Sequence, residues 1–565
     1  MRRWTPAIVF AAALAVRIAI VIQLHASTAL FRTPQLDSFE YHSWAQRIAS
    51  GDFSWPAAPP HGPGYPLFLG MLLAIGHGSV LFAHVAQAFL GAITAVVISA
   101  IARRTAGHVA ALIAGLAAAI YAPLALIEVS IYAEGLLVFL LSGSILAVIE
   151  PKRPLLMSFL AGTALGLAII VRPTAAILVP IYLVYVWRRM PRAAILFALA
   201  TAYPVLPVML QNWSATGDFL AIQSSGGLNL YIGNARDHDG TAWARPGGSW
   251  DWLRGEAWRA GIRGAAAEDR YYAHRALAEM RPSLVAKKLF WLLQNDEIRD
   301  SHSFDFFTER SALLRYAPRF GLLLPFAILG MFAMPRSSSK WLLIACAIAM
   351  SITIVALVVG MRYRMPLIPL LFVFAGAGAV ALRDRRAWMR FAVVAIITLA
   401  TTFAWRHAPT HNVGEEWAME GIALGKEGRF DEATSAFQHA LSLNARSAIG
   451  WTGLGDLALR RGNLTEAERL YGHSLDVDPR HALTYTHLAL ARAAAGDRAS
   501  AIEMLRRALS IRADRDAMYT LAGFLFADRD IDGAERWLRE LLRMNPSDSQ
   551  AQIALERTRA ARFHH

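Results

Sequence analysis

The chain has 565 residues, of which 55% are hydrophobic and 17% charged, and its mean hydropathy is +0.36. This composition is too apolar for an ordinary soluble protein and indicates many membrane spans. Residues 1–413 contain 36 Lys and Arg against 20 Asp and Glu, and residues 414–565 contain 20 Lys and Arg against 22 Asp and Glu. The basic excess behind the net charge of +14 therefore lies between the apolar runs, which does not indicate nucleic-acid binding. The single cysteine, Cys346, excludes an intrachain disulfide and is expected to be a buried free thiol.

Eleven apolar runs follow one another in the first 405 residues, and we interpret each as a transmembrane helix. They lie at 5–25, 80–101, 107–127, 131–149, 155–171, 174–187, 193–210, 318–334, 341–360, 366–382 and 391–405. No small-residue cleavage site follows the first run closely, which favours an anchor over a removed signal peptide. If the runs alternate, six short basic clusters share one side of the membrane, which the positive-inside rule assigns to the cytoplasm.

The opposite, outer side then carries two long loops, 26–79 and 211–317, together with everything after residue 405. In the first loop, LDSFEYHSWAQRIASGDF predicts a helix at the membrane surface, capped by Asp37 or Ser38 and with Glu40 one turn on. A run of Pro and Gly, HGPGYP, leads back into apolar sequence. The alternative interpretation of these acids is that they only cap the helix and face water.

The second outer loop contains an amphipathic run, PSLVAKKLFWLLQNDEIRD, at 282–300. This run predicts a helix that lies in the lipid headgroup layer with Lys287 and Lys288 near phosphates, or a helix packed on the membrane domain. Asp237, His238 and Asp239 are potential metal ligands, but adjacent residues rarely converge on one ion, so we predict a loop turn there.

The segment after residue 413 contains an internal repeat. Small residues recur at Ala433, Ala467, Ala501 and Ala534, with spacings of 34, 34 and 33 residues, and a large residue follows each of them four positions later. This period and residue order are those of tetratricopeptide repeats, which are helix–turn–helix units that stack into an arc with a concave binding face. We expect about four repeats, at 414–447, 448–481, 482–514 and 515–548.

The sequence lacks the nucleotide-binding GxxxxGK[ST] motif, the hydrolase GxSxG motif and the zinc-protease HExxH motif. The predicted topology instead gathers acids and arginines on the outer face, at Asp37, Glu40, Glu128, Glu134, Arg172, Arg362 and Arg364. Ionisable residues at membrane depth usually face a cavity or a partner, although arginines also snorkel to headgroups. Arginine forks bind phosphate, and a carboxylate takes a proton from a hydroxyl, so this set suits a reaction on a lipid-linked phosphate.

In this order and topology, four motifs resemble the GT-C integral-membrane glycosyltransferases, in the branch (families 39 and 83) of the protein O-mannosyltransferases and the bacterial aminoarabinose transferases that modify lipid A. The motifs are the first outer loop with PGYPLFLG, IIVRPTA, LYIGNARDHDG and RYRMPLIPLL, and the resemblance covers roughly residues 1–405. It implies a sugar donor on a polyprenyl phosphate and an inverting transfer to an acceptor hydroxyl on the outer face.

The resemblance also implies roles for individual residues. Asp37 matches the catalytic aspartate of the first loop, as general base, and Glu40 is a nearby acid that assists it or positions the acceptor. Arg362 and Arg364 match the late basic motif and hold the donor phosphate, with Arg172 as a further candidate. Residues expected at the acceptor or in the pocket are His42, Tyr65, Glu128 and Glu134. No cofactor and no metal site are expected.

The sequence therefore predicts an all-α protein with a polytopic transmembrane domain at 1–405, a linker at 406–413 and an α-solenoid of tetratricopeptide repeats at 414–565. We expect it in the bacterial inner membrane, with the site and the repeats in the periplasm and a protein partner in the repeat groove. The donor is expected to be a polyprenyl-phosphate sugar and the acceptor a protein, lipid or glycan. Two other hypotheses are an O-antigen ligase or polymerase, whose key residues are expected in a late outer loop, and a membrane-anchored repeat scaffold without enzymatic activity.

Overall fold

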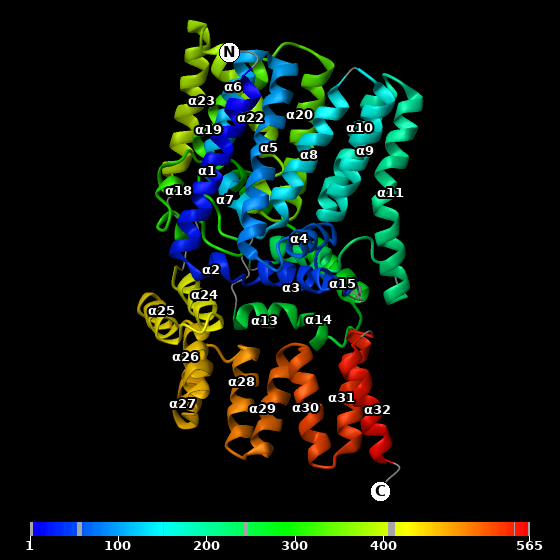
Figure 1. The fold of residues 1–565 in the computed structure, drawn as a ribbon, viewed down its shortest axis with the longest axis vertical. Coiled ribbons are helices and arrows are strands. Elements are labelled where there is room, and N and C mark those ends of the chain that lie inside the picture. The colour runs from blue at the N-terminus through cyan, green and yellow to red at the C-terminus, as the bar shows by residue number, and fades with distance from the viewer. Residues whose placement is uncertain are drawn as a thin grey trace.

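The computed structural model describes residues 4–53, 59–150, 152–217, 219–236, 238–241, 247–404, 413–546 and 548–562. Within these ranges the chain is almost entirely helical and forms no strand, apart from one isolated β-bridge between Thr241 and Val359. A bundle of long helices forms one end of the molecule, and the C-terminal helices form the other (Figure 1). The predicted linker at 406–413 lies almost wholly outside the described residues.

Each of the eleven apolar runs is helical. The corresponding elements are α1 (Thr5–Ser27), α5 (Val80–Ala106), α6 (His108–Ile120) with α7 (Ala122–Val129), α8 (Ala133–Ile149), α9 (Pro154–Val171), the 3-10 helix η1 (Pro173–Ile177) with α10 (Leu178–Trp187), α11 (Pro191–Thr216), α19 (Phe320–Ala333), α20 (Ser338–Ala356), α22 (Ile368–Ala381) and α23 (Arg385–Ala404). Within the described residues, α1, α5, α9, α11 and α20 are long and apolar enough to cross a membrane, and α6 with α7 makes a sixth candidate. The count of eleven spans stays a prediction.

The candidate span formed by α6 and α7 is bent by 60° at Tyr121. Tyr121 has an extended backbone, with φ −72° and ψ 112°. Pro123 follows in the first turn of α7, where a missing backbone N–H costs nothing, so the chain restarts a helix in a new direction. The residues of α7 and of the start of α8 are all buried in the bundle.

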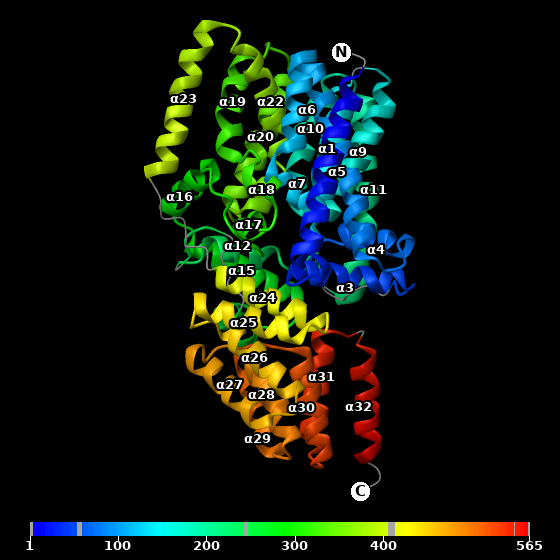
Figure 2. The same cartoon turned by 60° about the vertical axis from the view of Figure 1, so that its left-hand side comes forward.

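Short helices connect the bundle helices to one another and to the repeats. They are α2 (Ala29–Arg32), α3 (Asp37–Ala49), α4 (Gly64–Ile75), α12 (Gly226–Asn234), α13 (Gly248–Arg254), α14 (Glu256–Arg259), α15 (Ala265–Glu279), α16 (Pro282–Leu293), α17 (Phe304–Thr308), α18 (Ala312–Tyr316) and α21 (Met361–Arg364). Among them, α3 and α15 lie across the end of the bundle that faces the repeats (Figures 1 and 2). Lys288 of α16 is buried and donates hydrogen bonds to Asn234 Oδ1 and the Leu357 carbonyl, both at 2.8 Å. For the amphipathic run at 282–300, we predicted either a helix in the headgroup layer or a helix packed on the membrane domain. At Lys288 the structure shows packing.

The C-terminal helices are α24 (Val413–Lys426), α25 (Phe430–Leu443), α26 (Ala448–Arg460), α27 (Leu464–Val477), α28 (Ala482–Ala494), α29 (Arg498–Ile511), α30 (Arg515–Ala527), α31 (Ile531–Met544) and α32 (Ser549–Arg562). Among them, α24 to α31 form four helical pairs, and a ninth helix, α32, packs against α31. The four aligned alanines are fully buried. A Cβ added to Gly453 would lie 2.2 Å from the Phe437 ring, which explains why small and large residues alternate between the facing helices.

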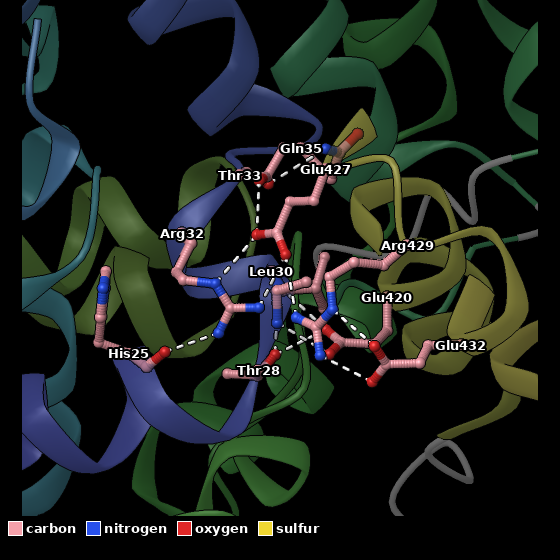
Figure 3. A network of polar contacts seen from close by, with 11 residues as sticks. His25, Thr28, Leu30, Arg32, Thr33, Gln35, Glu420, Glu427, Arg429 and Glu432 are labelled. Atoms are coloured by element: carbon pink, nitrogen blue, oxygen red, sulfur yellow. Dashed lines mark hydrogen bonds and ion pairs between the residues drawn. The ribbon is translucent and has the colours of Figure 1, made fainter. Parts of the chain in front are cut away.

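The first repeat docks directly on the bundle (Figure 3). Glu420 of α24 accepts hydrogen bonds from the Thr28 hydroxyl at 2.6 Å and from the backbone N–H groups of Ala29 and Leu30 at 2.8 and 3.0 Å. Arg32 and Glu427 add an ion pair at 2.9 Å. The carboxylate thereby satisfies backbone donors at the start of α2, and this contact fixes the repeat domain to the end of α1.

Beside this contact, Glu416 of α24 is buried and predicts a pH dependence. Its carboxylate accepts from the Ser303 backbone N–H at 2.8 Å and lies 3.1 Å from Arg299 Nε. Burial, and next to it the like charge of Glu415, raise the pKa of Glu416 from 4.5 to about 7, although Arg299 opposes the rise. Because the pKa is raised on folding, the stabilisation is fully present below about pH 4.5 and is lost as the pH rises through about 7.

We therefore expect hydrogen exchange in α24 to become faster between about pH 5 and pH 8, after correction for the intrinsic exchange rate. Glu416→Gln, which stays neutral, is expected to flatten this dependence. Glu432→Gln, at an exposed position of the same repeat, serves as the control. A pH profile that Glu416→Gln leaves unchanged would contradict the assignment.

Candidate functional site

The site begins at the start of α3. Leu36 has a left-handed backbone with φ 53°, an uncommon conformation for a residue with a side chain, and Asp37 follows as the first residue of the helix. The Asp37 side chain is 32% exposed, and its Oδ2 accepts hydrogen bonds from Arg362 Nη2 at 2.9 Å and from the Ser301 hydroxyl at 3.2 Å. The predicted capping by Asp37 or Ser38 is wrong, because the cap residue is Leu36 and no side chain caps the helix.

Arg362 is held on several sides. Its Nε donates to Asp300 Oδ1 at 2.8 Å, its backbone N–H donates to Asp300 Oδ2 at 3.1 Å, and its guanidinium lies 4.7 Å from the centre of the Tyr132 ring. The Arg362 side chain is 4% exposed and that of Asp300 is 3% exposed. Within the described residues the buried Nη1 of Arg362 has no hydrogen-bond partner. Arg362 thus retains donor capacity for an anion.

The ion pair determines the charge of Asp37. Burial raises the pKa of Asp37, but the positive charges of Arg362 and His61 lower it further than burial raises it, so the pKa lies well below its ordinary value of 3.8. Asp37 is therefore a carboxylate at neutral pH.

Two cavities meet at Arg362. One, of about 490 Å³, is lined mainly by apolar residues of α8, η1, α20 and the 219–226 segment, and its polar lining includes Glu134, Arg172, Asn229, Asp269, Arg270, Arg362 and Tyr363. The other, of about 170 Å³, is polar and is lined by Asp37, Glu40, Asn229, Trp250, Arg254, Asp300, Arg362 and Tyr363, among others. Arg172 and Glu134 form an ion pair at 2.5 Å. The arrangement suits an amphiphile whose anionic group lies at the junction of the two cavities.

The structure brings together five of the predicted site residues: Asp37 and Glu40 line the polar cavity, Glu134 and Arg172 line the apolar one, and Arg362 lines both. Glu40 is 44% exposed, and its Oε2 lies 2.9 Å from His61 Nε2. Because Glu40 is so exposed, it is better placed to contact a substrate than to accept the proton from the reacting hydroxyl.

Four other candidates line neither cavity. The Tyr65 hydroxyl donates to Gln87 Oε1 at 2.9 Å in the protein interior, and Glu128 forms a fully buried ion pair with Arg17 of α1. Arg364 is fully buried as well and donates to the carbonyls of Trp291 and Asp296 at 2.5 and 2.9 Å. His42 is half-buried, and burial lowers its pKa.

Sequence analysis missed several residues of the site. Asp300 is the last residue of the amphipathic run at 282–300, which was interpreted from its apolar side chains and its two lysines, and Ser301 follows it. Trp250 and Arg254 belong to a Trp/Gly-rich stretch without a recognisable motif. The one available signal was the acid-rich end of the run at 296–300, directly after its apolar part. In the predicted turn, Asp237 lies outside the described residues, and Asp239 Oδ1 accepts from the Thr241 backbone N–H at 2.9 Å.

Comparisons with known proteins identify the C-terminal part. Residues 446–514 and 492–557 match tetratricopeptide repeat family models, so these helices are tetratricopeptide repeats. No curated protein matches the chain. Among solved structures, MamA 41-end from Desulfovibrio magneticus RS-1 is 19% identical, with coverage of 30% of this chain and 96% of its own and a TM-score of 0.22.

A further similar structure is the archaeal oligosaccharyltransferase AglB from Archaeoglobus fulgidus, in complex with an inhibitory peptide and a dolichol-phosphate. It is 13% identical, with a TM-score of 0.43, and the match covers 74% of this chain and 58% of that one.

The contacts of Arg364 predict a structural role. Arg364→Met leaves Glu297, whose Oε2 lies 3.7 Å from Arg364 Nη1, as a buried unpaired acid, and is expected to destabilise the protein by about 3–5 kcal/mol. The double variant Arg364→Met/Glu297→Gln is expected to recover most of this loss in thermal unfolding experiments. An Arg364→Met protein that unfolds normally but no longer binds an anionic lipid would contradict the structural role.

Proposed function

We propose that the protein is a membrane glycosyltransferase that moves a sugar from a polyprenyl phosphate to an acceptor hydroxyl, with inversion at the anomeric carbon and with Asp37 as general base. The observation that supports this most strongly is the direct contact between Asp37 and Arg362 where an apolar cavity meets a polar one. In this proposal the polyprenyl chain occupies the apolar cavity. Its phosphate lies between Arg172 and Arg362, and the sugar extends into the polar cavity.

The proposed chemistry follows from these positions. As the acceptor oxygen bonds to the anomeric carbon, its proton passes to Asp37. The bond between the anomeric carbon and the phosphate oxygen breaks, and its electron pair leaves with the polyprenyl phosphate. Arg172 and Arg362 then stabilise the charge that gathers on the leaving phosphate. A single displacement of this kind inverts the anomeric configuration.

Donor binding also activates the base in this mechanism. A phosphate at Arg362 competes with Asp37 for the guanidinium and adds a negative charge nearby, and both effects raise the pKa of Asp37 toward that of a useful base. Asp300 holds Arg362 in place meanwhile, through its Nε and its backbone N–H. The ion pair seen in the structure is therefore the resting form of the proposed catalytic base.

We also propose that the site and the repeats lie on the periplasmic side of the bacterial inner membrane. The short basic clusters adjoin the opposite ends of the bundle helices, and the N-terminus marks that end in Figure 1. The second candidate function is a membrane-anchored repeat scaffold, which the tetratricopeptide repeats favour and which has no need of Asp37. An O-antigen ligase or polymerase is less well supported, since the key acid comes from the first outer loop.

Asp37→Asn separates these functions. We expect it to reduce sugar transfer by about 100-fold or more, because the base is lost, while binding of a polyprenyl phosphate is retained or becomes tighter, because Arg362 is released from Asp37. Thermal stability is expected to change little, because the Asp37 side chain is 32% exposed. Transfer is measured by mass spectrometry of envelope proteins and lipids, with a panel of polyprenyl-phosphate sugars as donors. Asp305→Asn is the matched control, because Asp305 lies in the same outer region and lines neither cavity.

Sealed vesicles of both orientations test the proposed side in the same assay. Added acceptor is expected to be modified only in vesicles that expose the repeats. Transfer that persists in Asp37→Asn, or an unaltered protein that transfers no sugar from any donor of the panel, would leave the scaffold as the better account.

A further inference from the structure

The segment that leads from α20 into α21 is held by the second outer loop. α20 ends at Ala356, and the chain then runs without helical structure until α21 begins. The Val359 backbone N–H donates to the Gly240 carbonyl at 3.1 Å, and the Met361 backbone N–H donates to the Ile298 carbonyl at 2.9 Å. In a continuous helix such donors would find partners within the helix, so here the loop supplies the acceptors.

Two side chains of the loop bind the carbonyl groups at the end of α20. Asn234 Nδ2 donates to the Ala356 carbonyl at 2.9 Å, and Lys288 Nζ donates to the Leu357 carbonyl at 2.8 Å. The two side chains are also joined, because Lys288 Nζ donates to Asn234 Oδ1 at 2.8 Å. A cation at the C-terminal end of a helix interacts favourably with the helix dipole. Asn234 of α12 and Lys288 of α16 therefore cap α20 together.

The motif LYIGNARDHDG, at 230–240, makes this close approach possible. A Cβ added to Gly233 would lie 1.7 Å from the Leu357 carbonyl oxygen. One added to Gly240, where φ is +89°, would lie 2.7 Å from Lys288 Cγ. Only glycine leaves room for the contact at these two positions. Since Asn234 belongs to the same motif, contact with the end of α20 and with Lys288 gives a physical reason for three of its residues.

Lys288 is a buried cation whose partners carry no charge. Its side chain is fully buried, and in the part of the chain that the structure describes its hydrogen-bond partners are the amide of Asn234 and the carbonyl of Leu357. Burial lowers the pKa of Lys288 from 10.5 to about 8. An apolar side chain of similar length would fill the same space without the cost of desolvating an ammonium group. The ammonium group is therefore better explained by the hydrogen bonds it donates than by packing.

The segment that Lys288 and Asn234 hold leads directly into the candidate site. Leu357 lines the apolar cavity, and Val358 lines the polar one. Arg362, which lines both cavities, follows only four residues after Leu357 and Val358 are passed on the way to it. A shift of the backbone at the end of α20 therefore moves the Arg362 guanidinium relative to both cavities.

We propose that Lys288, together with Asn234, is a positioning residue of the site: its ammonium group holds the end of α20 so that Arg362 lies at the junction of the two cavities. This inference rests on the proposed function, and it adds residues on which binding of the donor phosphate depends. Lys288 and Asn234 line neither cavity, so they act through Arg362 and contact no substrate.

The test compares Lys288→Met with Lys287→Met in the full-length protein. Methionine keeps most of the apolar stem of lysine and removes the ammonium group, and Lys287 is the neighbouring residue of α16 and lines neither cavity. We expect Lys288→Met to weaken binding of polyprenyl phosphate about tenfold, the effect of misplacing one charge-assisted contact. Affinity for the polyprenol, which has the same chain and no phosphate, is expected to stay unchanged. Lys287→Met is expected to change neither affinity.

Lys288→Gln, which keeps an N–H donor, is expected to recover part of the lost phosphate affinity. It also replaces Lys288→Met in the comparison if that variant does not fold. A role in packing alone would lower the unfolding temperature and leave the affinity of the folded protein for polyprenyl phosphate unchanged.

Hydrogen exchange provides a readout that needs no lipid. We expect exchange in residues 357–362 to become about tenfold faster in Lys288→Met, because the end of α20 loses a hydrogen bond, while residues 368–381 of α22 keep their rates.

Equal phosphate affinity in Lys288→Met and Lys287→Met would overturn the positioning role. An equal loss of affinity for polyprenyl phosphate and polyprenol would also overturn it, because the cavity as a whole would then have changed. If the unaltered protein binds no polyprenyl phosphate, the proposed function fails, and hydrogen exchange then decides the inference. Faster exchange at 357–362 in Lys288→Met would support the hold of Lys288 on this segment, and unchanged exchange would overturn it.

Discussion

The structure depends on a buried guanidinium that two carboxylates share. Arg362 lies between Asp37 and Asp300, and a charge with so little exposure is tolerated only when it is paired and hydrogen-bonded. Asp37 and Arg362 are 325 positions apart in the chain, so this one contact ties the first outer loop to the turn between α20 and α22. Removal of Asp300, which is buried as deeply as Arg362, is expected to cost about 3–5 kcal/mol, whereas loss of the 32% exposed Asp37 costs much less.

The same cluster explains why the outer loops and the repeats form one unit. Asp300 belongs to the segment that leads into α17, and the neighbouring Ser303 and Arg299 contact Glu416 of the first repeat. At the far edge, Asp251 of α13 contacts the later repeats while Trp250 and Arg254 line the polar cavity. The repeats are thus attached at two places, one next to Asp300 and one next to Trp250 and Arg254. Their position therefore affects the shape of the polar cavity.

Local sequence patterns predicted the elements well, because apolar runs and the 34-residue period depend on neighbouring residues. The pairing of Asp37 with Arg362 came from a family resemblance and from the predicted topology. These patterns could not predict the direction in which each side chain of a short turn points. Arg362 and Arg364 share a motif, yet one lines the cavities and the other binds backbone carbonyls, since the turn of α21 points them in different directions. Arg512, directly after α29, contacts Asp251 of a loop that is distant in the sequence, and local patterns do not reveal such a pairing.

The most direct test of the central claim is an experimental structure with a polyprenyl phosphate bound. Our account predicts that the lipid phosphate lies within hydrogen-bond distance of Arg362 and Arg172, that the lipid chain fills the apolar cavity, and that Asp37 has separated from Arg362. A phosphate bound elsewhere, with the Asp37–Arg362 ion pair intact, would contradict the account.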